Sequence, residues 1–240
     1  MNILVQKNYD DLSKKCAELI KAQIAAKSDS VLGLATGSTP LGTYKELIRM
    51  NHAGELDFSR AIAFNLDEYF PIKKSSDQSY HYYMRENLFK HVNFAQTFIP
   101  DGEAPDAAKE CAAYDEKIAA QGGIDLQILG IGNNGHIGFN EPDDKFTSAT
   151  NHTLLDESTI KANARFFASE SEVPRHSLTM GIGTIFRAKK IILLASGAGK
   201  ADAIFKATRG PITPQMPASV LQLHPDVTII ADEDAAKLIQ

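Results

Sequence analysis

Tryptophan is absent from this chain of 240 residues, and only two cysteines are present, Cys16 and Cys111. The cysteines lie far apart in the sequence, and neither belongs to a CxxC or a Cys/His spacing. The sequence therefore indicates neither a disulfide framework nor a zinc site. We expect a protein without a bound metal that works in a reducing cytoplasm.

Long hydrophobic runs are also missing. The longest apolar run without glycine, residues 191–195, is far shorter than the roughly 20 residues that span a bilayer, and acidic residues follow the amino terminus too early for a signal peptide. The 30 acidic and 25 basic residues give a formal net charge of −5, and the basic residues form no cluster. We therefore expect neither a membrane nor a nucleic acid as a partner.

The sequence does contain a regular alternation of short apolar runs with segments of helical character, over residues 12–24 and 107–120. This alternation favours an α/β fold, a doubly wound and mostly parallel sheet with helices on both faces. No linker, repeat or change of composition divides the chain, so we expect one domain over residues 1–240. The predicted strands cover residues 3–6, 31–35, 61–66, 126–132, 190–196 and 227–232.

The first candidate site is the segment LATGSTP, in which Thr36, Gly37, Ser38 and Thr39 follow a predicted strand. We expect Thr39 to cap the next helix and Pro40 to lie in its first turn. Free backbone N–H groups and the positive end of a helix converge at such a turn, so it is suited to a phosphate. An ordinary capped turn is the alternative.

The segment LGIGNNGHIGFNEP contains the spacing GxGxxG through Gly130, Gly132 and Gly135. A dinucleotide-binding loop lies near the first strand and opens a long helix, whereas here Pro142 follows within seven residues, so we do not favour a dinucleotide. We expect the glycines to let the backbone pass close to a different ligand. The residues from 140 to about 153 lack periodicity and predict a long loop, which in a compact domain is often functional.

Three titratable residues fit this picture. His136 and Glu141 emerge from the glycine-rich bend and predict an acid/base pair, although a lone histidine is often structural. Asp67 and Glu68 follow another apolar strand; because adjacent side chains of extended chain point in opposite directions, we expect one carboxylate to be functional and the other structural. A solvated acidic turn is the alternative.

Two cations are candidate phosphate ligands, with a solvated surface charge as the alternative for each. Arg165 lies between apolar and aromatic residues, and Lys200 follows the most apolar predicted strand. Lys200 is followed by Ala201, which excludes a Walker A loop but not a point-charge contact to phosphate. His81, Tyr82 and Tyr83 are predicted to pack a helix rather than to line a pocket.

Six segments occur along the chain in this order: TGSTP, FNLDEYF, GIGNNGHIGFNEP, NARFF, SGAGKADAI and LQLHP. With them the sequence closely resembles the glucosamine-6-phosphate deaminase (isomerising) family over nearly the whole chain. The resemblance implies the Rossmann-like fold of the sugar-phosphate isomerases and deaminases. It also implies conversion of glucosamine 6-phosphate and water into fructose 6-phosphate and ammonia, with no organic cofactor or metal and with a small-molecule sugar phosphate as partner.

The resemblance further implies roles for individual residues. His136 would assist opening of the sugar ring, with Glu141 orienting it, and Asp67 would move a proton between C2 and C1 through an enolamine. The residues implied to hold the 6-phosphate are Thr36 to Thr39, Arg165 and Lys200. The alternatives are a 6-phosphogluconolactonase-like sugar-phosphate hydrolase or isomerase, and a non-enzymatic sugar-phosphate sensing module.

Two departures from the family pattern modify these expectations. Many members carry aspartate at the position of Asn134, assigned to a triad with the histidine and glutamate, whereas an amide cannot counter the charge of an imidazolium. We therefore expect His136 to rely on Glu141 alone for charge support. The chain also stops about ten residues after its last predicted strand, earlier than allosteric hexameric members, so we expect a non-allosteric monomer or small homo-oligomer.

Overall fold

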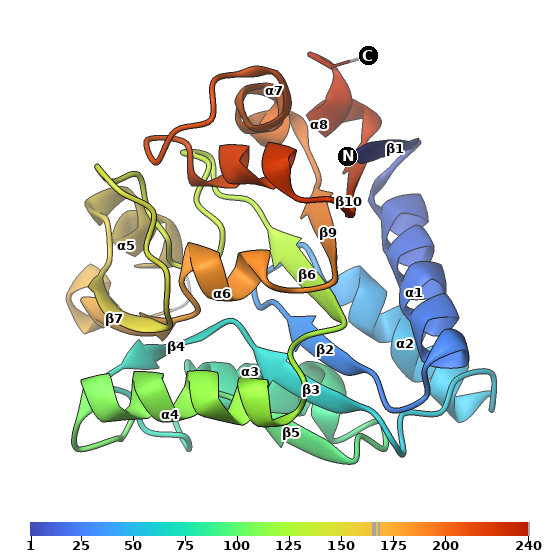
Figure 1. Cartoon of the computed structure of the whole chain (residues 1–240), viewed down its shortest axis with the longest axis horizontal. Helices are drawn as coiled ribbons and strands as arrows, with labels where there is room; N and C mark the ends of the chain where they lie inside the picture. Colours follow the sequence, from blue (N-terminus) through green and yellow to red (C-terminus); the bar gives the residue numbers. More distant parts are fainter. Residues whose placement is uncertain (165–166, 168, 240) are drawn as a thin grey trace.

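The computed structural model describes residues 1–164, 167 and 169–239. At its centre lies a seven-stranded sheet in the order β1-β10-β9-β6-β2-β3-β5, and every neighbouring pair is parallel (Figure 1). All six predicted strands and the predicted fold class are confirmed; within this sheet, the strand missing from the prediction is the short edge strand β5. The strands are β1 Asn2–Gln6, β2 Val31–Leu34, β3 Ile62–Asn65, β5 Gln96–Phe98, β6 Leu126–Gly130, β9 Lys190–Ala195 and β10 Val227–Asp232.

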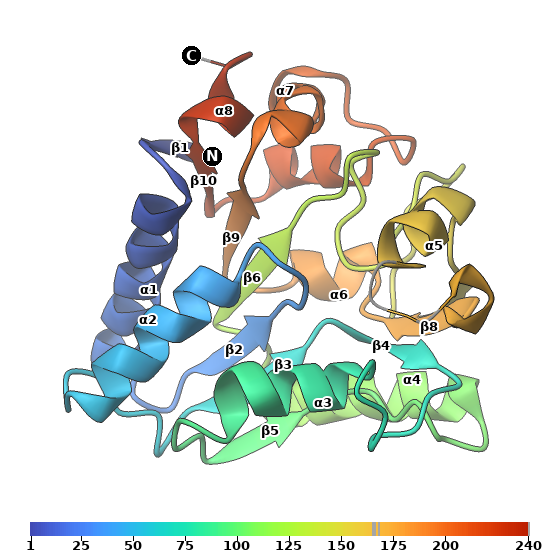
Figure 2. The ribbon, with the colours of Figure 1, turned by 180° about the vertical axis from the view of Figure 1, so that it is seen from behind.

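Helices cover both faces of this sheet, as predicted (Figures 1 and 2). The residues of β9 show why: Ile191 and Leu193 belong to the hydrophobic core on one face, and Ile192 and Leu194 to the core on the other. A strand buried on both sides is typical of a parallel sheet. One face carries α1 Tyr9–Ala26, α2 Leu41–His52, α3 Tyr80–Met84 and its continuation η1 Arg85–Phe89; the other carries α4 Ala107–Ala120, α6 Ile182–Phe186, α7 Ala201–Arg209, η5 Pro217–Leu223 and α8 Glu233–Ala236.

A second, antiparallel sheet of three strands was not predicted. Strands β4 Asp67–Phe70, β8 His176–Thr179 and β7 Asn151–Leu154 pair in the order β4-β8-β7. The predicted long loop is correct as far as Thr150, but its last residues form β7. The helices α5 Glu157–Asn163 and η3 Glu170–Glu172 lie in the same part of the chain.

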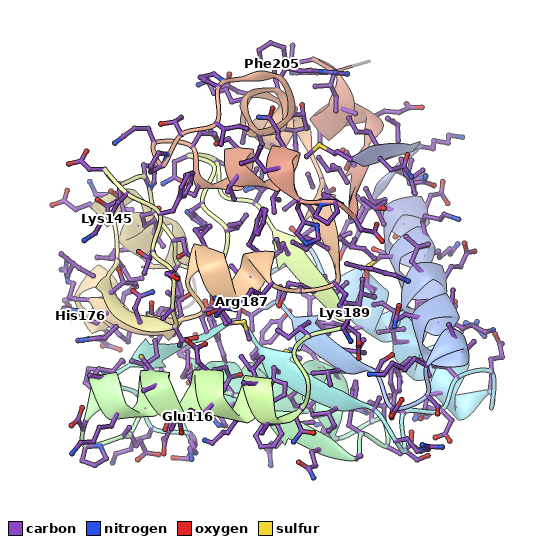
Figure 3. All side chains as sticks on the ribbon, viewed as in Figure 1. Glu116, Lys145, His176, Arg187, Lys189 and Phe205 are labelled. Atoms are coloured by element: carbon purple, nitrogen blue, oxygen red, sulfur yellow. The ribbon has the colours of Figure 1, made fainter. Side chains whose placement is uncertain are left out.

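The amino ends of the central strands are held by charge. Asp125, which precedes β6 and is 3% exposed, accepts a hydrogen bond from the backbone of Val31 and forms ion pairs with Lys27 and Lys189. Lys189 lies just before β9 at this end of the sheet (Figure 3). No helix among the described residues is both long and apolar enough to cross a membrane.

The order of strands creates a switch point between β2 and β6. From β2 the chain passes through α2 on one face to β3, whereas from β6 it passes through α6 on the other face to β9. The loops that leave the carboxyl ends of β2 and β6 therefore diverge and leave a crevice between them, which is where open α/β sheets bind ligands.

Candidate active site

A pocket of about 560 Å³ opens at the carboxyl ends of β2 and β6. It brings together residues that are far apart in the sequence, from the loops after both strands, from β4 and from the turn before α7. Of the ten residues predicted to be catalytic or to bind the substrate, eight line it: Thr36, Gly37, Ser38, Thr39, Asp67, Asn134, His136 and Lys200. Glu141 does not line the pocket but forms hydrogen bonds with Asn134 and His136, which do. Arg165 lies outside the described residues.

The turn after β2, which we call the phosphate turn (residues 36–39), is held in place by hydrogen bonds of two tyrosine hydroxyl groups. Gly37 has a φ of +93°, and its carbonyl oxygen accepts a hydrogen bond of 2.5 Å from Tyr83. The hydroxyl of Tyr9 donates to the carbonyl of Ser38 and accepts from the N–H of Gly42. This turn thus has a fixed shape while its residues face the pocket.

The prediction that Thr39 caps helix α2 is wrong. The capping position is held by Pro40, which makes no side-chain hydrogen bond, and the helix begins at Leu41. The first-turn N–H of Gly42 is bonded by the hydroxyl of Tyr9 at 2.8 Å, so Thr39 is not needed as a cap and lines the pocket instead.

Asp67 and Glu68 are both buried, which excludes a solvated acidic turn, and they have different surroundings. Asp67 is 5% exposed and lines the pocket, and its carboxylate accepts no hydrogen bond from the described residues. Burial and, second, the negative charge of Glu68 raise the pKa of Asp67 to about 8. Glu68 points away from the pocket, where its carboxylate accepts hydrogen bonds from the backbone of Tyr69, Tyr80 and His81.

His136, Glu141 and Asn134 form a connected group at the end of β6. The Nδ1 atom of His136 lies 3.0 Å from Oε2 of Glu141, and the side-chain amide of Asn134 donates to the same oxygen at 2.7 Å. The other oxygen of Glu141 accepts from the hydroxyl of Thr159. Burial favours the neutral form of Glu141, but the hydrogen bonds from these three side chains outweigh it and lower its pKa. Asn134 contacts His136 only through the backbone N–H.

The glycines of the bend serve the protein's own packing as well as the pocket, which modifies the sequence interpretation. A Cβ atom on Gly132 would lie 2.4 Å from Cε1 of His136, so the imidazole ring occupies the space that a side chain would need. Gly135 has a φ of +87°, and its missing side chain leaves room for the sulfur of Met216. No helix opens at this bend, because the chain from Ile131 to Thr150 contains none, in agreement with the rejection of a dinucleotide site.

Lys200 reaches the pocket from a braced loop between β9 and α7. The carboxylate of Asp232 accepts hydrogen bonds from the N–H of Gly197, at 2.9 and 3.0 Å, and from the hydroxyl of Ser196. Lys200 ends the short helix η4 Ala198–Lys200 that follows. A braced loop places a cation on the pocket wall next to the phosphate turn.

Sequence reasoning missed several residues of the site. Tyr80 and Thr159 both line the pocket, and Thr159 also bonds Glu141. Tyr83, predicted to pack a helix, also braces the phosphate turn. None of these lies in a glycine-rich or strand-end motif, so only the folded structure reveals them. Among the described residues, no three His, Cys, Asp or Glu side chains are grouped to hold a metal ion, and both cysteines are free and buried.

Comparisons of the sequence with known proteins agree with this geometry. The family model described as glucosamine-6-phosphate isomerases/6-phosphogluconolactonase matches residues 5–230. The glucosamine-6-phosphate deaminase of Thermoanaerobacter pseudethanolicus is 56% identical over 241 residues, which cover 100% of this chain and 95% of the relative. That of Clostridioides difficile is 55% identical over 238 residues, which cover 98% of this chain and 96% of the relative.

Solved structures give the same result. A monomeric glucosamine-6-phosphate deaminase matches with a TM-score of 0.96 and 45% identity, covering 99% of this chain and 100% of that chain. The 6-phosphogluconolactonase from Trypanosoma brucei matches with a TM-score of 0.78 at 21% identity, covering 100% and 98%, and therefore shares the fold. Because the identity to the deaminases exceeds one half over the full length, the chain belongs to the glucosamine-6-phosphate deaminase family.

Proposed function

We propose that Asp67, His136 and Glu141 carry out the isomerising deamination of glucosamine 6-phosphate, with water, to fructose 6-phosphate and ammonia. The chain is an enzyme of the deaminase family. The observation that carries the assignment of roles is a single pocket that joins three features: a buried carboxylate that accepts no hydrogen bond from the described residues, a carboxylate-supported imidazole and a turn suited to phosphate. We also propose that residues 1–240 act as one domain.

The phosphate turn and Lys200 hold the 6-phosphate of the sugar. Free N–H groups and hydroxyl groups of the turn donate hydrogen bonds to the phosphate oxygens, and the ammonium group of Lys200 supplies a charge. Binding energy gained at C6 orients the reacting carbons C1 and C2, which lie at the other end of the open chain. Arg165, by family resemblance, joins this set.

His136 opens the sugar ring. Because the Nδ1–H of its neutral imidazole donates to Glu141, the unprotonated Nε2 is left to take the proton of the C1 hydroxyl group. The imidazolium so formed returns a proton to the ring oxygen as the C1–O5 bond breaks. Glu141 stabilises the positive charge during this exchange, as its lowered pKa keeps it ionised near neutral pH.

Asp67 then moves one proton along the open chain. Its carboxylate removes the proton from C2, while the carbonyl oxygen at C1 takes up a proton that the substrate's ammonium group releases, which gives an enolamine between C1 and C2. The carboxyl group then delivers its proton to C1. The product is an imine at C2; water adds to this carbon and ammonia leaves, so that the 2-ketone of fructose 6-phosphate remains. All atoms are supplied by the substrate, by water and by the side chain that carries the proton.

The pKa of Asp67 predicts the acid side of the pH profile. A raised pKa of about 8 means that the carboxyl group holds its proton below that pH and is the required base only above it. We expect kcat/KM, corrected for ionisation of the substrate, to fall about tenfold for each pH unit below 8. Initial rates between pH 5.5 and 9 test this, and a flat profile down to pH 6 would contradict the raised pKa of Asp67.

Glu141 and Asn134 make different contributions to His136. We expect Glu141→Gln to lower kcat by about 100-fold, because the ionised partner of the imidazolium is lost, whereas Asn134→Ala removes only a neutral donor and costs about two- to tenfold. Steady-state rates of the two purified variants decide the order. A larger loss for Asn134→Ala would reject this division of labour.

The activity is tested by incubating the purified chain with glucosamine 6-phosphate and measuring ammonia and fructose 6-phosphate together. We expect the two products in equal amounts. Hydrolysis of 6-phosphogluconolactone without ammonia release from the amino sugar would favour the lactonase alternative, and binding without turnover would favour a sensing module.

We further propose that the enzyme acts as a monomer of 26.2 kDa, which light scattering checks directly.

A further inference from the structure

Glu68 has no part in the mechanism above, although it is fully buried and directly follows the proposed base. Its carboxylate accepts four hydrogen bonds and lies beside no positively charged lysine or arginine of the described residues. The donors are the backbone N–H groups of Tyr69, Tyr80 and His81 and the Nδ1 atom of His81, all between 2.8 and 3.0 Å. A buried carboxylate is costly unless it is hydrogen-bonded in this way.

These bonds join strand β4 to the start of helix α3. Tyr80, the first residue of α3, lines the pocket together with Asp67. One turn further on, the hydroxyl of Tyr83 donates to the carbonyl of Gly37 in the phosphate turn. A chain of direct contacts therefore runs from Glu68 through α3 to the phosphate turn.

We propose that Glu68 is a positioning residue with two effects: its carboxylate fixes helix α3 to strand β4, which sets the place of the phosphate turn relative to Asp67, and it holds a negative charge beside the carboxylate of Asp67. The inference rests on the proposed function. The distance between the phosphate site and the base decides whether C2 of a bound sugar reaches the base, and misplacement by about 1 Å lowers rates strongly.

The charge of Glu68 gives this role a signature that a purely structural residue lacks. Glu68 is one of the two causes that raise the pKa of Asp67, the other being burial. The tyrosines that interact with Asp67 have pKa values well above 10 and stay neutral through the working range; they are Tyr44, Tyr80 and Tyr114. Among the described residues, the other titratable groups nearby are His81, which contacts Glu68, and His136 and Lys200 across the pocket.

The test compares Glu68→Gln with His81→Ala, which removes one bond to Glu68 but keeps its charge. We expect Glu68→Gln to lower kcat about tenfold and to move the acid side of the kcat/KM profile down by about one pH unit. His81→Ala leaves the profile in place. A loss of activity in Glu68→Gln with an unmoved profile would overturn the proposal.

Two further measurements keep the inference separate from the proposed activity and from misfolding. Carbon-13 NMR of labelled aspartate carboxyl groups follows the titration of Asp67 without turnover. If the titration midpoint of Asp67 is lower in Glu68→Gln than in the parent, the inference is supported even if the parent releases no ammonia. If the parent and the variant are both active and the midpoint is unchanged, the inference is overturned while the proposed activity stands. If Glu68→Gln does not fold, Tyr83→Phe tests the contact between α3 and the phosphate turn instead. We expect KM to rise about fivefold while the pH profile of kcat/KM stays in place. An unchanged KM contradicts the proposal.

Discussion

Replacing Asp67 by asparagine is expected to lower kcat by about 10³- to 10⁴-fold while the variant folds and binds the sugar phosphate. The carboxylate is the only base proposed to reach C2 and C1, and an amide cannot take a proton from carbon. Asparagine has nearly the same shape as the neutral acid, so packing around the pocket is preserved. Steady-state rates and binding of the substrate by calorimetry measure the two effects; a loss of less than tenfold in kcat would remove Asp67 from the mechanism.

The same substitution is expected to stabilise the protein at alkaline pH. Because the folded-state pKa of Asp67 is about 8, above that of an unfolded aspartate, the parent loses stability as the pH rises from about 4 to 8, and the variant does not. The gap between the variant and the parent, that is, the difference in their free energies of unfolding, grows by up to about 1.4 kcal/mol for each pH unit in that interval. Denaturant unfolding of both proteins at pH 5 and pH 8 tests this, and an equal gap at the two pH values would contradict the raised pKa.

The second large effect is expected from a single methyl group at Gly132. A Cβ atom there would lie 2.4 Å from Cε1 and 2.5 Å from Nδ1 of His136, so Gly132→Ala must displace the imidazole ring from Glu141. Ring opening then loses its acid/base group, and we expect kcat to fall by about 100-fold or more. Rates measured with the purified variant test this.

Gly199→Ala is the matched control for that experiment. Gly199 is exposed, has no positive φ, and a Cβ atom there would meet nothing within 4 Å. We expect the control to keep the activity of the parent. If Gly132→Ala also does so, His136 has room to move and its fixed position is unimportant for the reaction.

The central sheet could be predicted because its strands carry their own signal. Runs such as the one at β9 are apolar on both faces, which is typical of a buried parallel strand. The sheet of β4, β7 and β8 carries no such signal: each strand has only four residues, and β7 is half exposed. The pairing of β4 with β8 depends on contacts between residues more than 100 positions apart, such as Asp67 with Thr179.

The site could be predicted where a residue type and a strand end coincide, as for Asp67 and His136. The alternation of side chains along extended chain also predicted that one of the two neighbouring carboxylates faces the pocket, although not which one. The cap assigned to Thr39 was wrong because the helix N–H it would bond is taken by Tyr9, 33 residues before Gly42. Thr159 could not be found, since its bond to Glu141 exists only in the folded chain.

In the proposed mechanism, one sugar must reach the base, the imidazole and the phosphate turn at once. A crystal structure with reduced, acyclic 2-amino-2-deoxyglucitol 6-phosphate tests this directly, because the alcohol at C1 cannot react. We expect the phosphate on the turn beside Lys200 and C2 about 3–3.5 Å from the carboxylate of Asp67. A phosphate bound elsewhere, or a C2 atom out of reach of Asp67 while the phosphate occupies the turn, would contradict the account.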